Sequence, residues 1–141
     1  MKIRITRLDA SAPLPARETA GAAGFDLAAA ADITVAPGQI VLVPTGLIIQ
    51  VPEGYFLGIF ARSSTPFKRG LMIPNGVGVV DTDYRGPEDE VKIQVYNFTA
   101  APVHIKRGDR IAQGIIIRHE VPEWEEGEPA QTTRGGFGST G

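Results

Sequence analysis

The segment NGVGVVDTDYRG, residues 75–86, contains the two carboxylates best suited to proton transfer, because they follow directly on an apolar stretch. Asp81 and Asp83 are two residues apart, so an extended chain would direct both side chains to the same face. A carboxylate in this position can take a proton from water or help to hold a divalent cation. The alternative is an Asp-rich turn that closes a hairpin for structural reasons alone.

The segment ARSSTPF, residues 61–67, offers groups that bind anions. Arg62, Ser63 and Ser64 place a guanidinium group and two hydroxyls at the end of a predicted strand, where a short helix can begin. Free backbone amides and a fork of charged donors converge in such a place. In the alternative interpretation, Ser63 or Ser64 only caps the helix and Arg62 pairs with a surface carboxylate.

Two further polar residues lie among apolar neighbours, Asp26 in AAGFDLAA (22–29) and Gln113 in RGDRIAQGI (107–115). A carboxylate such as Asp26 needs a partner, because burying an unpaired charge costs free energy. That partner can be a metal ion, an arginine or backbone amides, and a plain Asp–Arg pair is the structural alternative. Gln113 can equally be a satisfied polar group or a surface residue of a strand.

Other catalytic arrangements are missing from the sequence. The two histidines, His104 and His119, do not have the spacing of metal ligands, and no Ser–His–Asp arrangement can be argued. The absence of cysteine excludes a disulfide, a thiolate nucleophile and a cysteine-ligated metal. Any hydrolysis would therefore use an activated water, with a carboxylate as its base.

The octet RGGFGSTG, residues 134–141, combines four glycines with an arginine, a phenylalanine, a serine and a threonine. Glycine loses much backbone freedom on ordering, so this segment is poorly suited to folding by itself. The other four side chains are suited to holding a phosphate and covering a ring. Residues 121–133, VPEWEEGEPAQTT, have the composition of an acidic linker, which predicts a mobile arm that can reach elsewhere.

Composition narrows the class of protein. The chain has 141 residues, of which 43% are hydrophobic, as expected for one globular domain with a real core. A net charge of −2 gives no attraction to a nucleic-acid backbone or an anionic membrane. The first residues have no apolar signal-peptide core, and no apolar run approaches the roughly 20 residues that cross a bilayer. We therefore expect a cytoplasmic protein that binds neither nucleic acid nor membrane.

The 17 glycines and 11 prolines divide the chain into short segments that alternate in polarity or are rich in β-branched residues. Strands are predicted around Ile3 and Ile5 and in the segments 39–51, 55–60, 77–80, 91–98 and 110–117. Only two segments favour helix, the alanine-rich residues 27–32 and residues 63–69. The pattern predicts an all-β sandwich or barrel in residues 1–121, followed by a linker and arm in residues 122–141.

Five segments, in this order, resemble the five motifs of the trimeric deoxyuridine triphosphatase (dUTPase) family: AGFDLAA, ARSS, NGVGVVDTDYRG, GDRIAQ and RGGFGSTG. The resemblance extends over residues 23–141. It implies a jelly-roll-like distorted β-barrel or sandwich with a flexible glycine-rich C-terminal arm, and a homotrimer whose active sites are shared between subunits. It also implies Mg2+-assisted hydrolysis of dUTP to dUMP and pyrophosphate, which keeps uracil out of DNA and supplies dUMP for thymidylate synthesis.

The resemblance implies roles for individual residues. Asp81 corresponds to the general base that deprotonates the water attacking the α-phosphorus. Tyr84 corresponds to the residue that packs against the deoxyribose and leaves no room for a 2′-hydroxyl. Asp26 corresponds to a carboxylate near the metal-bound triphosphate, which acts on the ion indirectly.

The remaining matched residues are implied substrate contacts. Backbone groups of residues 75–80, which include Asn75, Gly78 and Val80, would read the edge of uracil. Further contacts to the nucleotide are implied for Arg62, Ser63, Ser64, Lys92, Gln113, Arg134, Phe137, Gly138, Ser139 and Thr140. In the arm, Phe137 would cover the uracil while the residues after it hold the γ-phosphate, so that ordering of the arm closes the site.

Two other functions stay open on the sequence alone. A dCTP deaminase has the same fold and binds a related triphosphate, although such chains are longer and do not end in a GFGSTG arm. A non-catalytic, dUTP-responsive binding protein would use the arm to expose or hide a partner surface, with the acidic residues 124–128 as a docking segment. Such a sensor would not need the base Asp81.

Overall fold

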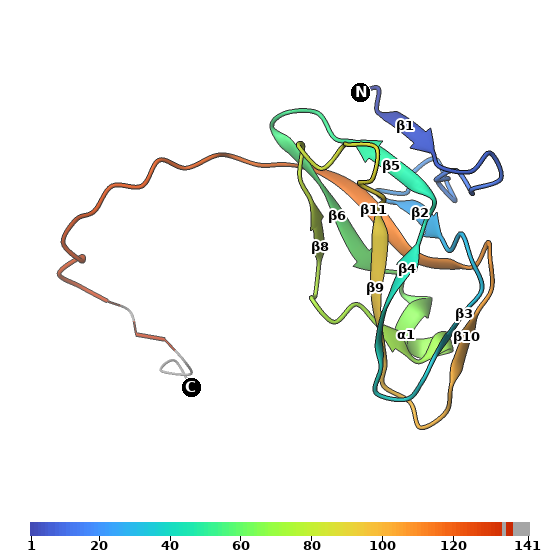
Figure 1. The fold of residues 1–141 in the computed structure, drawn as a ribbon. Helices are drawn as coiled ribbons and strands as arrows, with labels where there is room; N and C mark the ends of the chain where they lie inside the picture. The colour runs from blue at the N-terminus through green and yellow to red at the C-terminus, as the bar shows by residue number, and fades with distance from the viewer. Residues whose placement is uncertain (134, 137–141) are drawn as a thin grey trace.

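Short antiparallel strands pair into two main sheets (Figure 1). The structure is a computed structural model that describes residues 1–133, 135 and 136. The larger sheet, of order β2-β11-β6-β8, contains β2 (Phe25–Ala28), β11 (Arg110–Arg118), β6 (Tyr55–Ala61) and β8 (Gly78–Val80). The smaller sheet, of order β4-β9-β7, contains β4 (Ile40–Pro44), β9 (Lys92–Asn97) and β7 (Leu71–Met72). Two strand pairs complete the body, β1 (Arg4–Arg7) with β5 (Leu47–Gln50) and β3 (Ile33–Val35) with β10 (Val103–Ile105).

Side chains from both sheets meet in one apolar core, because every second residue of a strand points to the same face. In β9, Ile93 and Val95 are fully buried, whereas Lys92 is exposed and Gln94 is half-buried. The larger sheet contributes residues such as Leu57 to the same core. Within the described residues the strand pairings leave both sheets open, so the predicted all-β architecture takes the form of a sandwich and not of a closed barrel.

The predicted strand segments are confirmed, and the longest of them is divided in two. Residues 39–51 form β4 and β5, which are separated by Thr45 and Gly46. Gly46 has a φ of +69°, and a Cβ built there would lie 2.8 Å from the Cβ of Ala12, so the position requires glycine. Strands β3, β7 and β10 were not predicted, since two or three residues are too few to show an alternation.

The prediction of helix in residues 27–32 is wrong. Strand β2 extends through Ala28, and Leu27 and Ala29 are both 0% exposed. Pairing with β11 and burial of alternate side chains outweigh alanine's helix propensity, which is worth less than about 1 kcal/mol per residue.

The helix predicted at residues 63–69 is confirmed as α1 (Ser64–Arg69), which follows β6 directly. Gly70, with a φ of +67°, ends it, and the Gly70 amide donates to carbonyls of the last turn. The short connection between β6 and α1 therefore contains Arg62 and Ser63. No helix in the described part of the chain is long or apolar enough to span a membrane.

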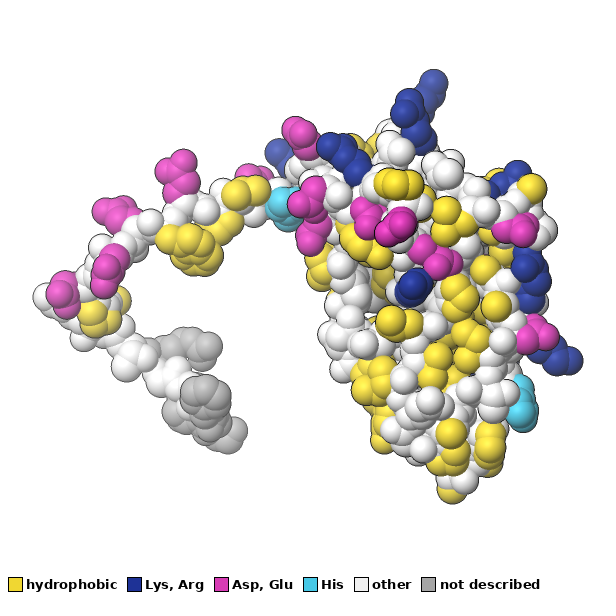
Figure 2. Space-filling model, in the orientation of Figure 1, with side chains coloured by type: hydrophobic (Ala, Val, Ile, Leu, Met, Phe, Trp, Pro, Cys, Tyr) yellow, Lys and Arg dark blue, Asp and Glu magenta, His cyan; other side chains and the backbone are white. Residues whose placement is uncertain are grey.

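Residues 119–133 form neither strand nor helix, and Figure 1 shows this segment leaving the sandwich after β11. Acidic side chains are spread along it (Figure 2), and its tryptophan, Trp124, is 91% exposed. Residues 121–133, whose composition predicts a linker, are all exposed, while the division at residues 121 and 122 stays a prediction.

Asn97, at the end of β9, joins three segments of the sandwich and is 0% exposed. Its amide nitrogen donates to the carbonyls of Val35, at 2.9 Å, and Ala101, at 2.8 Å. Its amide oxygen accepts bonds from the backbone nitrogen and the hydroxyl of Thr99, at 2.9 and 2.8 Å.

Replacement of Asn97 by leucine, which is similar in size, tests how much the hydrogen bonds of the Asn97 amide contribute to stability. Asn97→Leu removes the donor to the buried Val35 carbonyl and the acceptor of the Thr99 amide, so we expect the free energy of unfolding to fall by about 2–4 kcal/mol. Urea unfolding followed by circular dichroism measures the change. Gln131→Leu, in the exposed linker, is the control and should change stability by less than about 0.5 kcal/mol. Equal stability of the two variants would contradict the role given to Asn97.

Candidate active site

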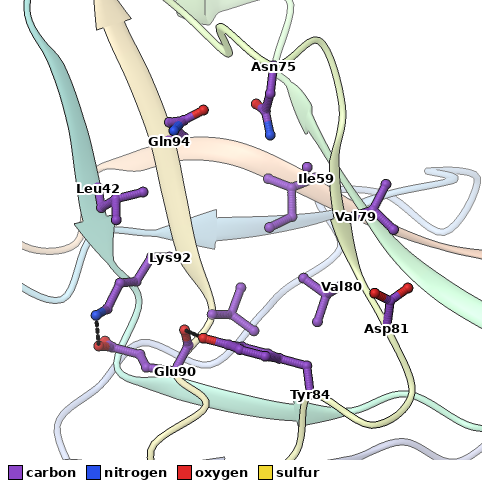
Figure 3. A pocket seen from close by; sticks show the side chains of 12 residues that line it. Leu42, Ile59, Asn75, Val79, Val80, Asp81, Tyr84, Glu90, Lys92 and Gln94 are labelled. Atoms are coloured by element: carbon purple, nitrogen blue, oxygen red, sulfur yellow. Dashed lines mark hydrogen bonds and ion pairs between the residues drawn. The ribbon is translucent and has the colours of Figure 1, made fainter.

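A cavity of about 380 Å³ is lined by residues from both sheets (Figure 3). Strands β4 and β9 contribute Leu42, Lys92 and Gln94 from the smaller sheet, while β6 and β8 contribute residues from the larger sheet. Six residues predicted from the sequence line this first cavity: Asn75, Gly78, Val80, Asp81, Tyr84 and Lys92. Segments distant in the sequence are thus brought together.

The carboxylate of Asp81 is exposed at the first cavity. Among the described residues it has no ion-pair partner, so it is available to accept a proton. Strand β8 ends at Val80, and the Tyr84 amide donates to the Asp81 carbonyl at 3.3 Å, which turns the chain. Because of this turn, Asp83 does not line the cavity, and the prediction that both carboxylates share one face is wrong.

Tyr84 lies at the same cavity and is held by its hydroxyl. The hydroxyl donates to the carbonyl of Glu90 at 3.1 Å, and the ring remains 40% exposed (Figure 3). The Glu90 carboxylate lies 3.9 Å from the ammonium nitrogen of Lys92 and accepts a bond from the Gly46 amide at 2.8 Å. These contacts fix the tyrosine ring relative to β9.

The chain before Asp81 brings backbone groups to the cavity. Strands β7 and β8 belong to different sheets, so residues 73–77 form a turn between the sheets. Gly76 in this turn has a φ of +73°, a conformation that favours glycine. At Gly78, an added Cβ would lie only 3.1 Å from the Cβ of Ile59, so glycine allows β8 to approach β6 closely.

A second cavity, of about 220 Å³, brings together Asp26, Arg62, Ser63 and Gln113, four more of the predicted residues. One Asp26 carboxylate oxygen lies 2.7 Å from Nε of Arg62, and the other lies 2.9 Å from Nη1 of Arg110. The Asp26 side chain is only 12% exposed. The Asp–Arg pair anticipated for Asp26 is therefore present, with two arginines and not one.

The register of β11 places Gln113 opposite Asp26 on β2 and opposite Phe60 on β6. The side-chain amide of Gln113 donates to the Ala61 carbonyl at 3.0 Å. A Cβ built at Gly24 would lie 2.9 Å from the Gln113 side-chain oxygen, so the glycine of the first motif leaves room for this glutamine.

Ser63 occupies the N-cap position of α1, but its side chain makes no capping hydrogen bond in the described structure. The interpretation of Ser63 as a simple cap is therefore wrong. The buried hydroxyl of Thr65 accepts a bond from the Arg62 amide at 3.2 Å and donates to the Ile111 carbonyl at 2.8 Å. Ser63 thus keeps its hydroxyl for the second cavity, which Ser64 does not line.

The two cavities have no lining residue in common. The first has apolar walls and a carboxylate, which suit a nucleoside and a proton-transfer step. The second has a guanidinium, a hydroxyl and an amide, which suit an anion, together with two carboxylates that are paired with arginines. Arg134, Phe137, Gly138, Ser139 and Thr140, the predicted residues of the arm, lie outside the residues that the structure describes.

Several lining residues were missed by the sequence analysis, among them Leu42, Glu90 and Gln94 of the first cavity and Glu18 of the second. The alternation in β9 could have placed Gln94 on the face of Lys92, two residues away. For Leu42 and Glu18 the sequence offers no local signal, because strand pairing alone brings them to the cavities.

Comparison with known proteins identifies the family. A family model described as dUTPase matches residues 10–141. The chain belongs to the dUTPase family. The deoxyuridine 5′-triphosphate nucleotidohydrolase of Wolinella succinogenes is 44% identical over 144 residues, which cover 100% of this chain and 95% of that relative.

Solved dUTPase structures share the fold. The crystal structure of dUTPase from Streptococcus mutans has a TM-score of 0.79 and 36% identity, and covers 88% of this chain and 100% of its own. The Staphylococcus bacteriophage 80alpha dUTPase with dUPNHPP has a TM-score of 0.88 at 23% identity, covering 99% of this chain and 98% of its own. The jelly-roll fold expected from the dUTPase resemblance is therefore confirmed.

An ion pair connects α1 to the turn that precedes β11. Nη1 of Arg69 lies 2.9 Å from a carboxylate oxygen of Asp109, which also accepts a bond from the Lys106 amide at 2.9 Å. The hydrogen bond from Arg69 lowers the pKa of Asp109 below its ordinary value, with help from the Lys106 amide and against the effect of burial.

The sign of this pKa shift predicts how stability depends on pH. A carboxyl group with a lowered folded-state pKa stabilises the fold above its unfolded-state pKa, and this contribution is lost as the pH falls through the folded-state value. Asp109→Asn should therefore lower the free energy of unfolding by about 0.5–1 kcal/mol at neutral pH. The difference should shrink as the pH falls below about 4. Urea unfolding of both proteins across this range measures it, and a difference independent of pH would contradict the assignment.

Proposed function

We propose that this protein hydrolyses dUTP to dUMP and pyrophosphate. Membership of the dUTPase family supports this activity, as do relatives named deoxyuridine 5′-triphosphate nucleotidohydrolase. The observation that carries the proposal is the cavity of about 380 Å³, in which the exposed Asp81 carboxylate lies near a tyrosine ring fixed by its hydroxyl. The cytoplasm is the compartment in which we expect this reaction.

Asp81 is the proposed general base. A carboxylate that no cation neutralises can orient a water molecule and take its proton while the oxygen attacks the α-phosphorus. The bond from the α-phosphorus to the bridging oxygen then breaks, and pyrophosphate leaves. The exposure of Asp81 at the cavity supports this role, because the water must reach it from solvent.

Selection of the nucleoside is proposed for the other residues of the first cavity. The Tyr84 ring, whose position is set by its bond to Glu90, would pack against the deoxyribose and collide with a 2′-hydroxyl. Backbone groups near Asn75, Gly78 and Val80 would pair with the edge of uracil, since cytosine would leave the same groups unpaired.

The triphosphate is proposed to bind the residues of the second cavity, with Arg62, Ser63 and Gln113 as donors. Because this cavity has no lining residue in common with the first, we propose a homotrimer in which one subunit supplies the nucleoside side and another the phosphate side. Ser64 and Lys92 are further proposed contacts. In this proposal a third segment, the arm with Arg134, Phe137, Gly138, Ser139 and Thr140, covers the bound nucleotide.

Mg2+ is proposed to accompany the triphosphate. No group of three or more His, Cys, Asp or Glu side chains in the described ranges is arranged to hold an ion, and Asp26 already bonds to two arginines. This donor set fits an ion held mainly by phosphates and water, as is usual for Mg2+. Bound there, the ion would neutralise phosphate charge, with Asp26 as a nearby carboxylate that acts on it indirectly.

A comparison of substrates tests the proposed activity. With Mg2+ present, we expect pyrophosphate release from dUTP and at least about a hundredfold slower release from dCTP, dTTP and UTP, because each of these presents a wrong group to a fixed site. Chromatography identifies the product. Formation of uracil nucleotides from dCTP would instead indicate a deaminase, and tight binding of dUTP without turnover would indicate a nucleotide-responsive binding protein.

Replacement of the proposed general base, Asp81, by its neutral isostere asparagine tests the mechanism. Asp81→Asn should lower kcat by about 10²–10⁴-fold, the usual contribution of a general base, while dUTP still binds. Asp83→Asn is the matched control, because Asp83 is exposed two residues away and does not line the cavity. Comparable loss of activity in both variants, or in neither, would rule out the assignment to Asp81.

A further inference from the structure

The second cavity contains a carboxylate that the proposed reaction does not use. Glu18 lines it together with Asp26, and both carboxylates bind Nη1 of Arg110. The two carboxylates and the two cations Arg62 and Arg110 balance in charge. A site proposed to attract a triphosphate is therefore electrically neutral when it is empty.

The two carboxylates differ in how firmly they are held. Asp26 lies on β2, is only 12% exposed and bonds to a different arginine through each oxygen. Glu18 lies in the loop before β2, is 64% exposed and pairs only with Arg110 among the described residues. Removal of Glu18 from its partner therefore exposes little new surface and disturbs no strand.

The loop that carries Glu18 has a defined path. Ala16 forms a bridge with Asp26, whose amide donates to the Ala16 carbonyl at 2.8 Å. Arg17 donates to the carbonyls of Ala20 and Ala22 and so closes the turn that follows. Glu18 is thereby held beside the cavity, with its side chain largely exposed to solvent.

We infer that the Glu18 carboxylate pairs with the Arg110 guanidinium only while the phosphate site is empty. When the substrate binds, one of its phosphate groups replaces Glu18 at Arg110. This inference rests on the proposed function. It gives Arg110, which is 47% exposed, a second role besides holding Asp26, that of a phosphate-binding cation. Only non-covalent contacts are exchanged: the Glu18–Arg110 bond breaks and a phosphate–Arg110 bond forms.

The contact between Glu18 and Arg110 is electrostatically favourable. The hydrogen bond from Arg110 to Glu18, followed by the charges of Glu18 and Asp26, raises the pKa of the Arg110 guanidinium. A phosphate that binds Arg110 must therefore compete with Glu18, and Glu18 repels it as well. The competition weakens binding of both substrate and the pyrophosphate product.

Binding of inorganic pyrophosphate to the full-length protein tests the competition. By calorimetry in metal-free buffer, Glu18→Gln should bind pyrophosphate about three- to tenfold more tightly than the original protein, with a smaller gain at high salt. Glu18→Asp, which keeps the charge, should return the affinity towards the original value. Glu53→Gln controls for net charge, because Glu53 is exposed and lines neither cavity.

A double-mutant cycle shows whether the effect passes through Arg110. In an Arg110→Gln background, Glu18→Gln should no longer tighten pyrophosphate binding, because the cation for which the two anions compete is gone. Unchanged or weaker binding by Glu18→Gln, or an equal gain in both backgrounds, would overturn the exchange. If the Glu18–Arg110 pair instead serves only to stabilise the fold, Glu18→Gln should bind pyrophosphate more weakly and have a lower melting temperature.

The outcome can be separated from that of the proposed function. If the original protein hydrolyses dUTP and Glu18→Gln leaves both KM and pyrophosphate affinity unchanged, the inference on Glu18 fails and the proposed function stands. If the original protein hydrolyses no dUTP and binds no pyrophosphate, the proposed function fails, and the exchange with it.

Discussion

The geometry of the second cavity depends on the ion pairs of one largely buried carboxylate. The Asp26 side chain is 12% exposed, and Arg62 and Arg110 balance its charge from two directions. These three residues come from β2, from the connection after β6 and from the start of β11, and β2 and β6 pair with β11 but not with each other. The ion pairs therefore connect segments that hydrogen bonding alone would leave without a direct link.

The two cavities are built by different physical means. Around the first, the path of the main chain dominates. The turn of residues 73–77 crosses between the sheets, Gly78 lies close to Ile59, and Tyr84 is fixed by its bond to the Glu90 carbonyl. Around the second, charge dominates, and positions are set by pairs of opposite sign. A division of this kind suits a substrate with one flat, weakly polar end and one highly charged end.

Much of this arrangement could be predicted from the sequence, because strands with alternating polarity and motifs next to turns leave local signals. The longer strands and α1 followed from such signals, and the resemblance to the dUTPase motifs grouped Asp81 with Tyr84. Other features could not be predicted locally. Helix propensity misled at Leu27, where burial against β11 decides the conformation. Simple alternation failed at Asp83 because the strand ends three residues earlier, and Glu18 reaches its cavity only through the pairing of Ala16 with Asp26.

The exposed position of Trp124 has a consequence for spectroscopy. It is the only tryptophan in the sequence, and it is 91% exposed on the segment that leaves the sandwich. We therefore expect Trp124 to emit as a solvated indole in the folded protein, so that tryptophan fluorescence would scarcely register unfolding of the core. The same isolation makes Trp124 a native reporter for the linker, because any blue shift on adding a nucleotide would come from that segment and from no other part of the chain.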